Sequence, residues 1–204
     1  MTLSGVLDEG DSISVFWSGN HTGIYSAAHP GLTFNGRAVG GSTLVSMAAR
    51  FDADVVFKPK VVTILIGAND VYSIGSLGSP YTVTADYLTA LFAYAAKWRA
   101  TGAKVLVGTV FAQCQVGNPN NVNGRQNTAR VPVNTGIRAA IGAKIDGVID
   151  YAADPVMGTD AAPCDTTWFV DGVHPTSGAT GGIVDGQGRM AITYSTSVDL
   201  ALLP

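Results

Sequence analysis

Residues 61–67 read VVTILIG, and this stretch decides the fold class. Its β-branched and apolar residues follow one another without alternation, and a glycine ends the run. A continuous run of this kind is typical of a strand that is buried on both faces, as in a parallel sheet. Similar runs occur at 105–111 (VLVGTVF) and 147–151 (GVIDY). The sequence therefore predicts parallel strands at all three places.

A helix is predicted between the first two runs, over residues 84–101. Its apolar residues recur at the spacing of one helical face, and Gly102 suits the position that ends a helix. Further helices are expected over 42–56, 125–145 and 189–203. This alternation of strands and helices favours an α/β fold with right-handed crossovers and helices on both faces of the sheet.

The pattern predicts the first strand less clearly than the others. Residues 4–9 (SGVLDE) hold too few apolar side chains for a central strand, so we expect a strand that is short or starts late. The next strand candidate lies near residues 32–34. The chain between Ser12 and that candidate leaves little room for a full crossover helix.

Composition limits the class of protein. The chain has 204 residues, of which 47% are hydrophobic and only 13% charged, with a net charge of -3. We expect a single globular domain over residues 1–204 that binds no nucleic acid, because phosphate contacts need clustered Lys and Arg. Apolar runs are too short for stable membrane insertion. No signal peptide is visible, although the composition suits a secreted enzyme, and nothing indicates the oligomeric state.

The two cysteines, Cys114 and Cys164, leave two alternatives open. They form one disulfide or remain two buried thiols, and they cannot build a tetrahedral zinc site on their own. A bridge would favour an exported protein.

Polar fragments follow the predicted strands, and in parallel sheets ligands bind beyond the carboxyl ends of the strands. Long polar loops are expected over 70–81, 113–126 and 175–188. The fragments are GDSI at 10–13, GAND at 67–70 and DGVHPT at 171–176. Together they supply what nucleophilic acyl transfer needs: a hydroxyl, a base, a carboxylate that orients the base, and a donor for the oxyanion. These groups are Ser12, His174, Asp171 and Asn69.

Each residue also has a structural interpretation. Ser12 could cap a helix, and Asn69, Asp70 and Asp171 are ordinary turn residues. We interpret Asp11 as an acceptor of backbone hydrogen bonds and Asp70 as a residue that fixes its loop. The combination of all fragments in one chain favours the catalytic interpretation.

In these blocks the sequence resembles the SGNH (GDSL-type) hydrolase family. Ser12 matches the nucleophile, Asp171 and His174 match the acid and base, and Asn69 matches the side-chain oxyanion donor. In the block GRAVGGST at 36–43, Gly41 best matches the backbone donor. The resemblance implies a flavodoxin-like three-layer α/β/α fold with a five-stranded parallel sheet. It also implies hydrolysis of esters or thioesters without a metal or other cofactor.

The literal string SGNH at residues 18–21 is a false lead, because the four letters belong to separate blocks of the family. We expect it to form a surface loop, with His21 and His29 as ordinary surface residues. Trp17 and Tyr72 are equally suited to a pocket or to the core, and Trp168 better suits the core.

The function predicted from these features is a serine esterase for short-chain acyl esters, with acetyl esters on carbohydrate as the favoured substrates. A lysophospholipase, thioesterase or acyltransferase is the alternative within the same family, since the same triad serves them all. A catalytically inactive glycan-binding module is the alternative from another class.

Overall fold

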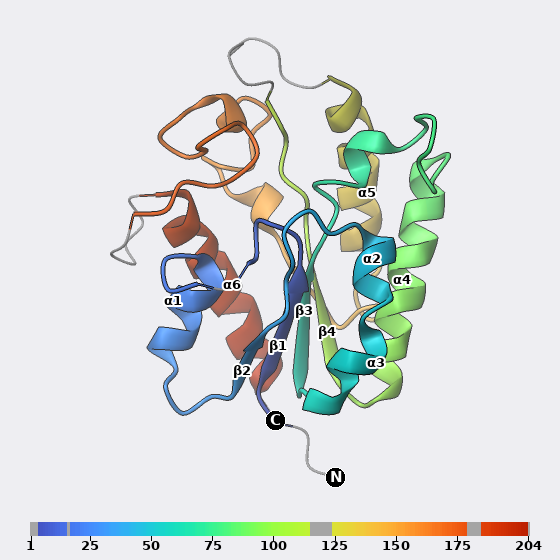
Figure 1. The fold of residues 1–204 in the computed structure, drawn as a ribbon. Coiled ribbons are helices and arrows are strands. Elements are labelled where there is room, and N and C mark those ends of the chain that lie inside the picture. Colours follow the sequence, from blue (N-terminus) through green and yellow to red (C-terminus); the bar gives the residue numbers. More distant parts are fainter. Residues whose placement is uncertain (1–3, 16, 115–123, 179–184, 204) are drawn as a thin grey trace.

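The computed structural model describes residues 4–15, 17–114, 124–178 and 185–203 (Figure 1). Its five strands form one parallel sheet in the order β2-β1-β3-β4-β5. This is the flavodoxin-like order, and it confirms the predicted α/β class. The strands are β1 (Val6–Gly10), β2 (Phe34–Gly36), β3 (Val61–Leu65), β4 (Lys104–Gly108) and β5 (Gly147–Ile149).

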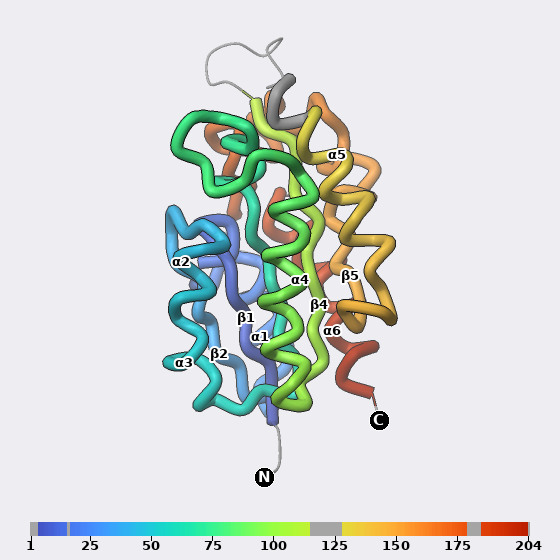
Figure 2. Tube along the Cα trace, turned by 90° about the vertical axis from the view of Figure 1, so that its right-hand side faces the viewer, coloured from blue at the N-terminus to red at the C-terminus, as the bar shows by residue number. Residues whose placement is uncertain are grey.

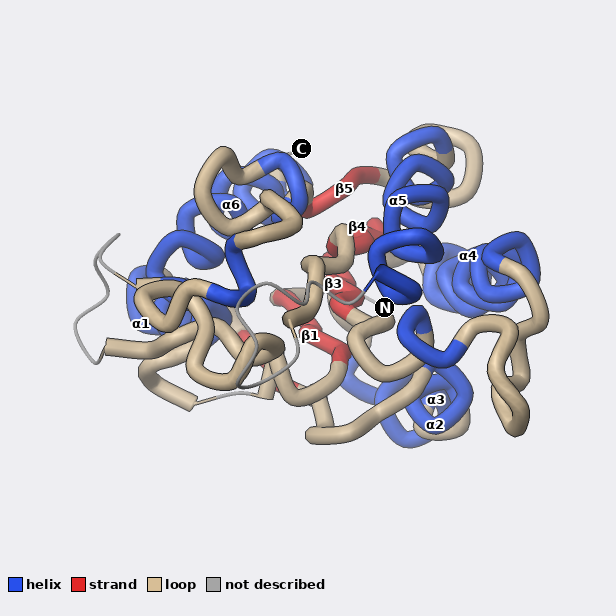
Figure 3. The backbone as a smooth tube through the Cα atoms, turned by 90° about the horizontal axis from the view of Figure 1, so that it is seen from above, coloured by secondary structure: helices blue, strands red, loops and turns tan. Residues whose placement is uncertain are grey.

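Helices cover both faces of the sheet, which completes the three layers (Figures 2 and 3). One face carries α1 (His21–Ala28) and α6 (Gly186–Leu202). The other carries α2 (Leu44–Ala48), α3 (Phe51–Asp54), α4 (Thr84–Ala100) and α5 (Gly124–Ala139). Short 3-10 helices are η1 (Val55–Phe57), η2 (Val71–Ser73), η3 (Tyr151–Ala153) and η4 (Ala162–Cys164).

The long helices confirm the predicted periodicity, while the candidate over 42–56 divides into α2, α3 and η1. The loop expected over 175–188 is described only in part, because residues 179–184 lie outside the described residues. The same holds for residues 115–123 of the loop over 113–126. No helix among the described residues combines the length and apolarity needed to cross a lipid bilayer.

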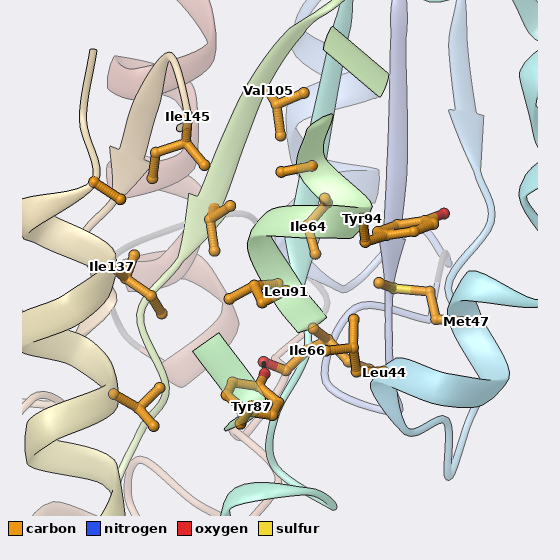
Figure 4. Close-up of a cluster of buried hydrophobic side chains, with 14 of the residues drawn as sticks. Leu44, Met47, Ile64, Ile66, Tyr87, Leu91, Tyr94, Val105, Ile137 and Ile145 are labelled. Atoms are coloured by element: carbon orange, nitrogen blue, oxygen red, sulfur yellow. Dashed lines mark hydrogen bonds between the residues drawn. The ribbon is translucent and has the colours of Figure 1, made fainter. Parts of the chain in front are cut away.

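The continuous apolar run of β3 is explained by the two halves of the core. Val62 and Ile64 belong to the core cluster that also contains residues of α2, α4 and α5. Figure 4 shows Ile64 among these side chains. Val61 and Leu65 pack into the second cluster, which also contains residues of α1 and α6. Because both faces of the strand are covered, neither face needs polar side chains.

The expectation of a short or late first strand is wrong. β1 pairs with both β2 and β3, and all five of its residues are buried, including Asp8 and Glu9. Their carboxylates find donors on neighbouring elements. The Thr63 hydroxyl donates to Asp8 at 2.6 Å. The Tyr94 hydroxyl and the Trp98 indole N–H donate to Glu9 at 2.7 and 3.0 Å.

Glu9 makes the stability of the protein depend on pH. Burial raises the pKa of Glu9 to about 7, although the hydrogen bonds from Tyr94 and Trp98 lower it. The native state therefore holds this proton more tightly than the unfolded chain, in which the pKa is about 4.3. The stabilising contribution is complete below that lower value and is lost as the pH rises through about 7.

We expect Glu9→Gln to remove this pH-dependent loss of stability. Between about pH 5 and about pH 7.5, the free energy of unfolding of the wild type should fall by roughly 2–3 kcal/mol more than that of the variant. Urea unfolding at both pH values measures the difference. Parallel pH profiles of the two proteins would contradict the assignment.

The interpretation of residues 18–21 as a surface loop is also wrong. Asn20 caps α1, since its side chain accepts the N–H of Gly23 at 2.8 Å. His21 is fully buried, and its Nδ1 lies 2.8 Å from Oε1 of Gln187 on α6. Burial lowers the pKa of His21 to about 4. His29 is partly exposed, at 34%, and its Nε2 lies 3.5 Å from Oδ1 of Asp199.

Candidate active site

The candidate site lies at the edge of the sheet formed by the carboxyl ends of the strands, which is the upper edge in Figure 1. The strand order reverses between β1 and β3, and such a switch point is where open α/β sheets bind their ligands. Ser12 follows β1 and Asn69 follows β3. The segment with Asp171 and His174 lies between η4 and α6, and the fold brings it to Ser12.

Ser12, His174 and Asp171 form a continuous chain of hydrogen bonds. The Ser12 Oγ lies 2.8 Å from Nε2 of His174, and Nδ1 of the same ring lies 2.7 Å from Oδ2 of Asp171. Because a carboxylate only accepts, the Nδ1 atom carries the proton and Nε2 is free to accept the hydroxyl proton. The arrangement is a hydroxyl activated by a base that a carboxylate orients.

The Asp171 carboxylate is held in its ionised form. Burial alone raises its pKa, but the hydrogen bonds from His174 and Val173 outweigh burial, so the pKa lies below its usual value. The backbone N–H groups of His174 and Val173 both donate to Oδ1, at 2.8 and 3.0 Å. The second oxygen is thereby left for the imidazole ring.

A tight contact fixes the turn between Asp171 and His174. Gly172 has a φ of 84°, and a Cβ at this position would lie 2.4 Å from the carbonyl oxygen of Cys114. The N–H of Cys114 donates to the carbonyl of Gly172 at 3.0 Å. Cys114 is joined to Cys164 by a disulfide, which decides between the two alternatives for the cysteines. Only glycine fits this turn.

The side chain of Asn69 lies against the loop that follows β2. Its Nδ2 donates to the carbonyl of Ser42 at 2.9 Å. An Asn amide has two N–H donors, so one remains for a ligand. Asp70 is buried and accepts the N–H of Leu44 at 2.9 Å, and it therefore fixes the loop as expected. Burial raises the pKa of Asp70 to about 6.

Asp11 links the segment that follows β1 to the loop with Asn69. Its carboxylate accepts the N–H of Ile13 at 3.0 Å and the N–H of Ala68 at 3.3 Å. Burial raises the pKa of Asp11 to about 6, although these hydrogen bonds lower it. The expected structural role of Asp11 agrees with these contacts.

The loop with the predicted backbone donor contains two adjacent glycines. The N–H of Ser42 donates to the carbonyl of Val39 at 3.1 Å, which closes a turn with Gly40 and Gly41 at its centre. Gly41 has a φ of 74°, as a type II turn requires at this position. A Cβ on Gly40 would lie 4.0 Å from the Ser12 Cβ, whereas none of the described atoms would lie within 4 Å of a Cβ on Gly41.

Gly40 is therefore a second candidate donor that sequence reasoning missed. Among the described residues, the backbone N–H groups of Ser12, Gly40 and Gly41 donate to no protein acceptor. The adjacent glycines are the only signal in the sequence, and the family resemblance favours Gly41 over Gly40.

The site is open to solvent. The side chains of Asp171 and His174 are 44% and 41% exposed. Trp17, between β1 and α1, and Tyr72, on η2, are about half exposed, at 48% and 50%. Trp168 is partly buried, and the guanidinium of Arg189 lies 5.5 Å from the centre of its ring.

Comparison of the sequence with known families identifies one match. The sequence model of the GDSL-like lipase/acylhydrolase family matches residues 10–178. This range contains all the residues of the candidate site. A search of curated proteins finds no significant match.

Solved structures with the same fold cover nearly the whole chain. A GDSL-like lipase from Bacteroides thetaiotaomicron has a TM-score of 0.70 at 22% identity, over 97% of this chain and 87% of that chain. The acetyl xylan esterase AlAXEase has a TM-score of 0.70 at 19% identity, over 94% and 98%. Axe2, an acetylxylan esterase from Geobacillus stearothermophilus, has a TM-score of 0.67 at 19% identity, over 98% and 95%.

Proposed function

The chain belongs to the GDSL-like lipase/acylhydrolase family, and on this premise we propose that it is a serine esterase for short-chain acyl esters, with acetyl esters on carbohydrate as natural substrates. The observation that carries the proposal is the chain of hydrogen bonds from Ser12 through His174 to Asp171. Family membership supports ester hydrolysis in general, and the shape of the site supports the choice of substrate.

In the first half of the proposed reaction, Nε2 of His174 takes the proton of the Ser12 hydroxyl as Oγ attacks the acyl carbon. The Asp171 carboxylate stabilises the imidazolium that forms. Negative charge develops on the carbonyl oxygen and is stabilised by the amide of Asn69 and by backbone N–H groups of Ser12 and of Gly40 or Gly41. His174 then protonates the leaving alcohol, and the acyl group remains on Ser12.

In the second half, a water molecule takes the place of the alcohol. His174 removes a proton from this water as its oxygen attacks the acyl carbon, and the same donors stabilise the second oxyanion. Collapse of this intermediate releases the carboxylic acid and returns the proton to Ser12 Oγ.

The choice of an acetylated carbohydrate rests on exposure and on aromatic side chains. An open site admits a large polar alcohol group such as a sugar chain. Trp17 and Tyr72 lie on loops that follow β1 and β3, the same strands that lead to Ser12 and Asn69. Exposed aromatic rings offer apolar faces with a polar edge, which suits sugar rings. Acetylxylan esterases among the structures with this fold agree with the proposal.

One observation favours the alternative within the family. An apolar surface pocket of about 490 Å³ lies where η2, α4 and α5 meet; none of the candidate site residues lines it, and its apolar lining suits a longer acyl chain that extends to it from Ser12. A lysophospholipase or thioesterase would use such a pocket. Its lining residues are Ile74, Val83, Thr84, Thr128, Ala129 and Pro132.

Hydrolysis of 4-nitrophenyl acetate, butyrate and octanoate tests the proposal. We expect kcat/KM to be highest for acetate, because nothing in the proposed reaction requires binding energy from a long chain. A preference for octanoate that is lost in Ala129→Trp would instead support the apolar pocket and a lipid substrate. A protein inert toward all three esters would favour the glycan-binding module.

Variants of the two aromatic residues test whether these side chains bind the sugar part of the substrate. Trp17→Ala and Tyr72→Ala are expected to raise KM for acetylated xylo-oligosaccharides and to leave the hydrolysis of 4-nitrophenyl acetate near the wild-type rate. Equal effects on both substrates would contradict a role in sugar binding.

A further inference from the structure

Residues 113 and 114, which follow β4, lie between the two halves of the candidate site. The side-chain Nε2 of Gln113 donates to the carbonyl of Ala68 at 2.8 Å. The next residue, Cys114, donates its backbone N–H to the carbonyl of Gly172 at 3.0 Å. One dipeptide thus contacts the loop with Asn69 and also the turn between Asp171 and His174.

The contact with Ala68 acts on the peptide group that leads to Asn69. The carbonyl that Gln113 binds belongs to the bond between Ala68 and Asn69, and the N–H on the other side of Ala68 is bound by Asp11. Both peptide groups of Ala68 are therefore held. Asn69 itself is exposed, and among the described residues its side-chain amide makes one hydrogen bond, to the carbonyl of Ser42. The direction of this amide depends on the peptide groups behind it.

The dipeptide itself is anchored on its other side. The disulfide joins Cys114 to Cys164 at the end of η4. Gly172 packs directly against the Cys114 carbonyl, so the turn with the acid and the base cannot move independently of residue 114. Gln113 is thus hydrogen-bonded to the peptide group that precedes Asn69, and Cys114 to the turn that precedes His174.

We propose that Gln113 is a positioning residue for the reaction: through Ala68 it sets the Asn69 amide at its place relative to Ser12, from a segment that also fixes the acid–base turn. The inference rests on the proposed function. Gln113 touches no reacting atom in this scheme and acts only through Asn69. Its amide N–H is required, because the Ala68 carbonyl needs a donor.

Gln113→Met tests the proposal, since methionine keeps the length of the side chain and removes the donor. Loss of one neutral hydrogen bond predicts about a three- to tenfold decrease in kcat for 4-nitrophenyl acetate, with KM little changed. In an Asn69→Ala background the same substitution should change kcat less than about twofold, because the group it positions is absent. Equal losses in both backgrounds, or no loss in the wild type, would overturn the proposal.

A measurement independent of turnover separates this inference from the proposed function. The side-chain amide signals of Asn69, assigned by their absence in the Asn69→Ala spectrum, should shift in the ¹⁵N-¹H spectrum of Gln113→Met. Unmoved signals would overturn the positioning role even in an active enzyme. Shifted signals in a protein without esterase activity would support the role of Gln113 and contradict the proposed function.

Gln113→Glu supplies a pH signature that a general packing role does not produce. Only the protonated carboxyl can donate to the Ala68 carbonyl, and the ordinary pKa of a glutamate is about 4.3. The activity of this variant relative to the wild type should therefore fall as the pH rises from about 4 to about 7. A ratio that does not depend on pH would contradict the proposal. This variant also serves if Gln113→Met does not reach the wild-type fold by circular dichroism.

Discussion

Replacing Ser12 with alanine is expected to reduce the turnover of 4-nitrophenyl acetate by about 10⁴-fold or more, since removal of a triad nucleophile leaves only the oxyanion donors and binding. The 2.8 Å contact between Ser12 Oγ and His174 Nε2 is the physical reason. Steady-state kinetics of purified wild type and variant measures the loss, and thermal unfolding shows whether the variant retains its fold.

Ser14→Ala is a matched control. Ser14 lies two residues further along the chain, is fully buried, and its hydroxyl has no hydrogen-bond partner among the described residues. Removal of this hydroxyl should leave kcat near the wild-type value. A Ser12→Ala protein that keeps more than about a tenth of wild-type activity would remove Ser12 from the mechanism.

Asn69→Ala is expected to have the second largest effect, a decrease in kcat of about 10²–10³-fold, or roughly 2.7–4 kcal/mol of transition-state stabilisation. The amide acts on charge that is present only in the transition state, so KM should change little. Because Asn69 is exposed and its side chain loses one hydrogen bond, to the Ser42 carbonyl, its replacement should lower the melting temperature only slightly.

Steady-state kinetics over a range of ester concentrations measures kcat and KM of Asn69→Ala separately. A variant that raises KM and leaves kcat unchanged would contradict the oxyanion role. It would place Asn69 in substrate binding instead.

Much of the fold follows from local patterns in the sequence. The apolar run of β3 and the periodicity of α4 are visible because each reflects burial that repeats along the chain. The fragments GDSI and GAND can be recognised for a related reason, since they follow β1 and β3 and parallel strands bring their carboxyl ends to one edge. The fragment DGVHPT follows no strand directly and is recognised by the spacing of Asp171 and His174. The structure joins Ser12, His174 and Asp171 at this edge.

Other elements depend on partners far along the chain and could not be predicted. Asp8 and Glu9 make β1 look too polar for a central strand. They can be buried there because Thr63, Tyr94 and Trp98 donate hydrogen bonds to their carboxylates. Nothing near His21 in the sequence indicates that it is buried, because its hydrogen-bond partner, Gln187, lies on the last helix. Local composition does not show such long-range hydrogen bonds.

Contacts within the candidate site also cannot be predicted from local sequence. The resemblance favours Gly41 as the backbone donor, and only the folded turn from Val39 to Ser42 brings Gly40 close to Ser12. Gln113 belongs to no motif, and its contact with Ala68 exists only in the folded chain. The pairing of Cys114 with Cys164 was one of two open alternatives until the structure brought them together.

The central claim is that the Ser12 hydroxyl, activated by His174, is the nucleophile that carries the acyl group. Reaction with a fluorophosphonate, followed by proteolysis and mass spectrometry, tests it most directly. The account predicts one adduct per chain, located on Ser12, and almost no adduct in His174→Ala. An adduct on another residue, or an unmodified protein that still hydrolyses esters, would contradict the account.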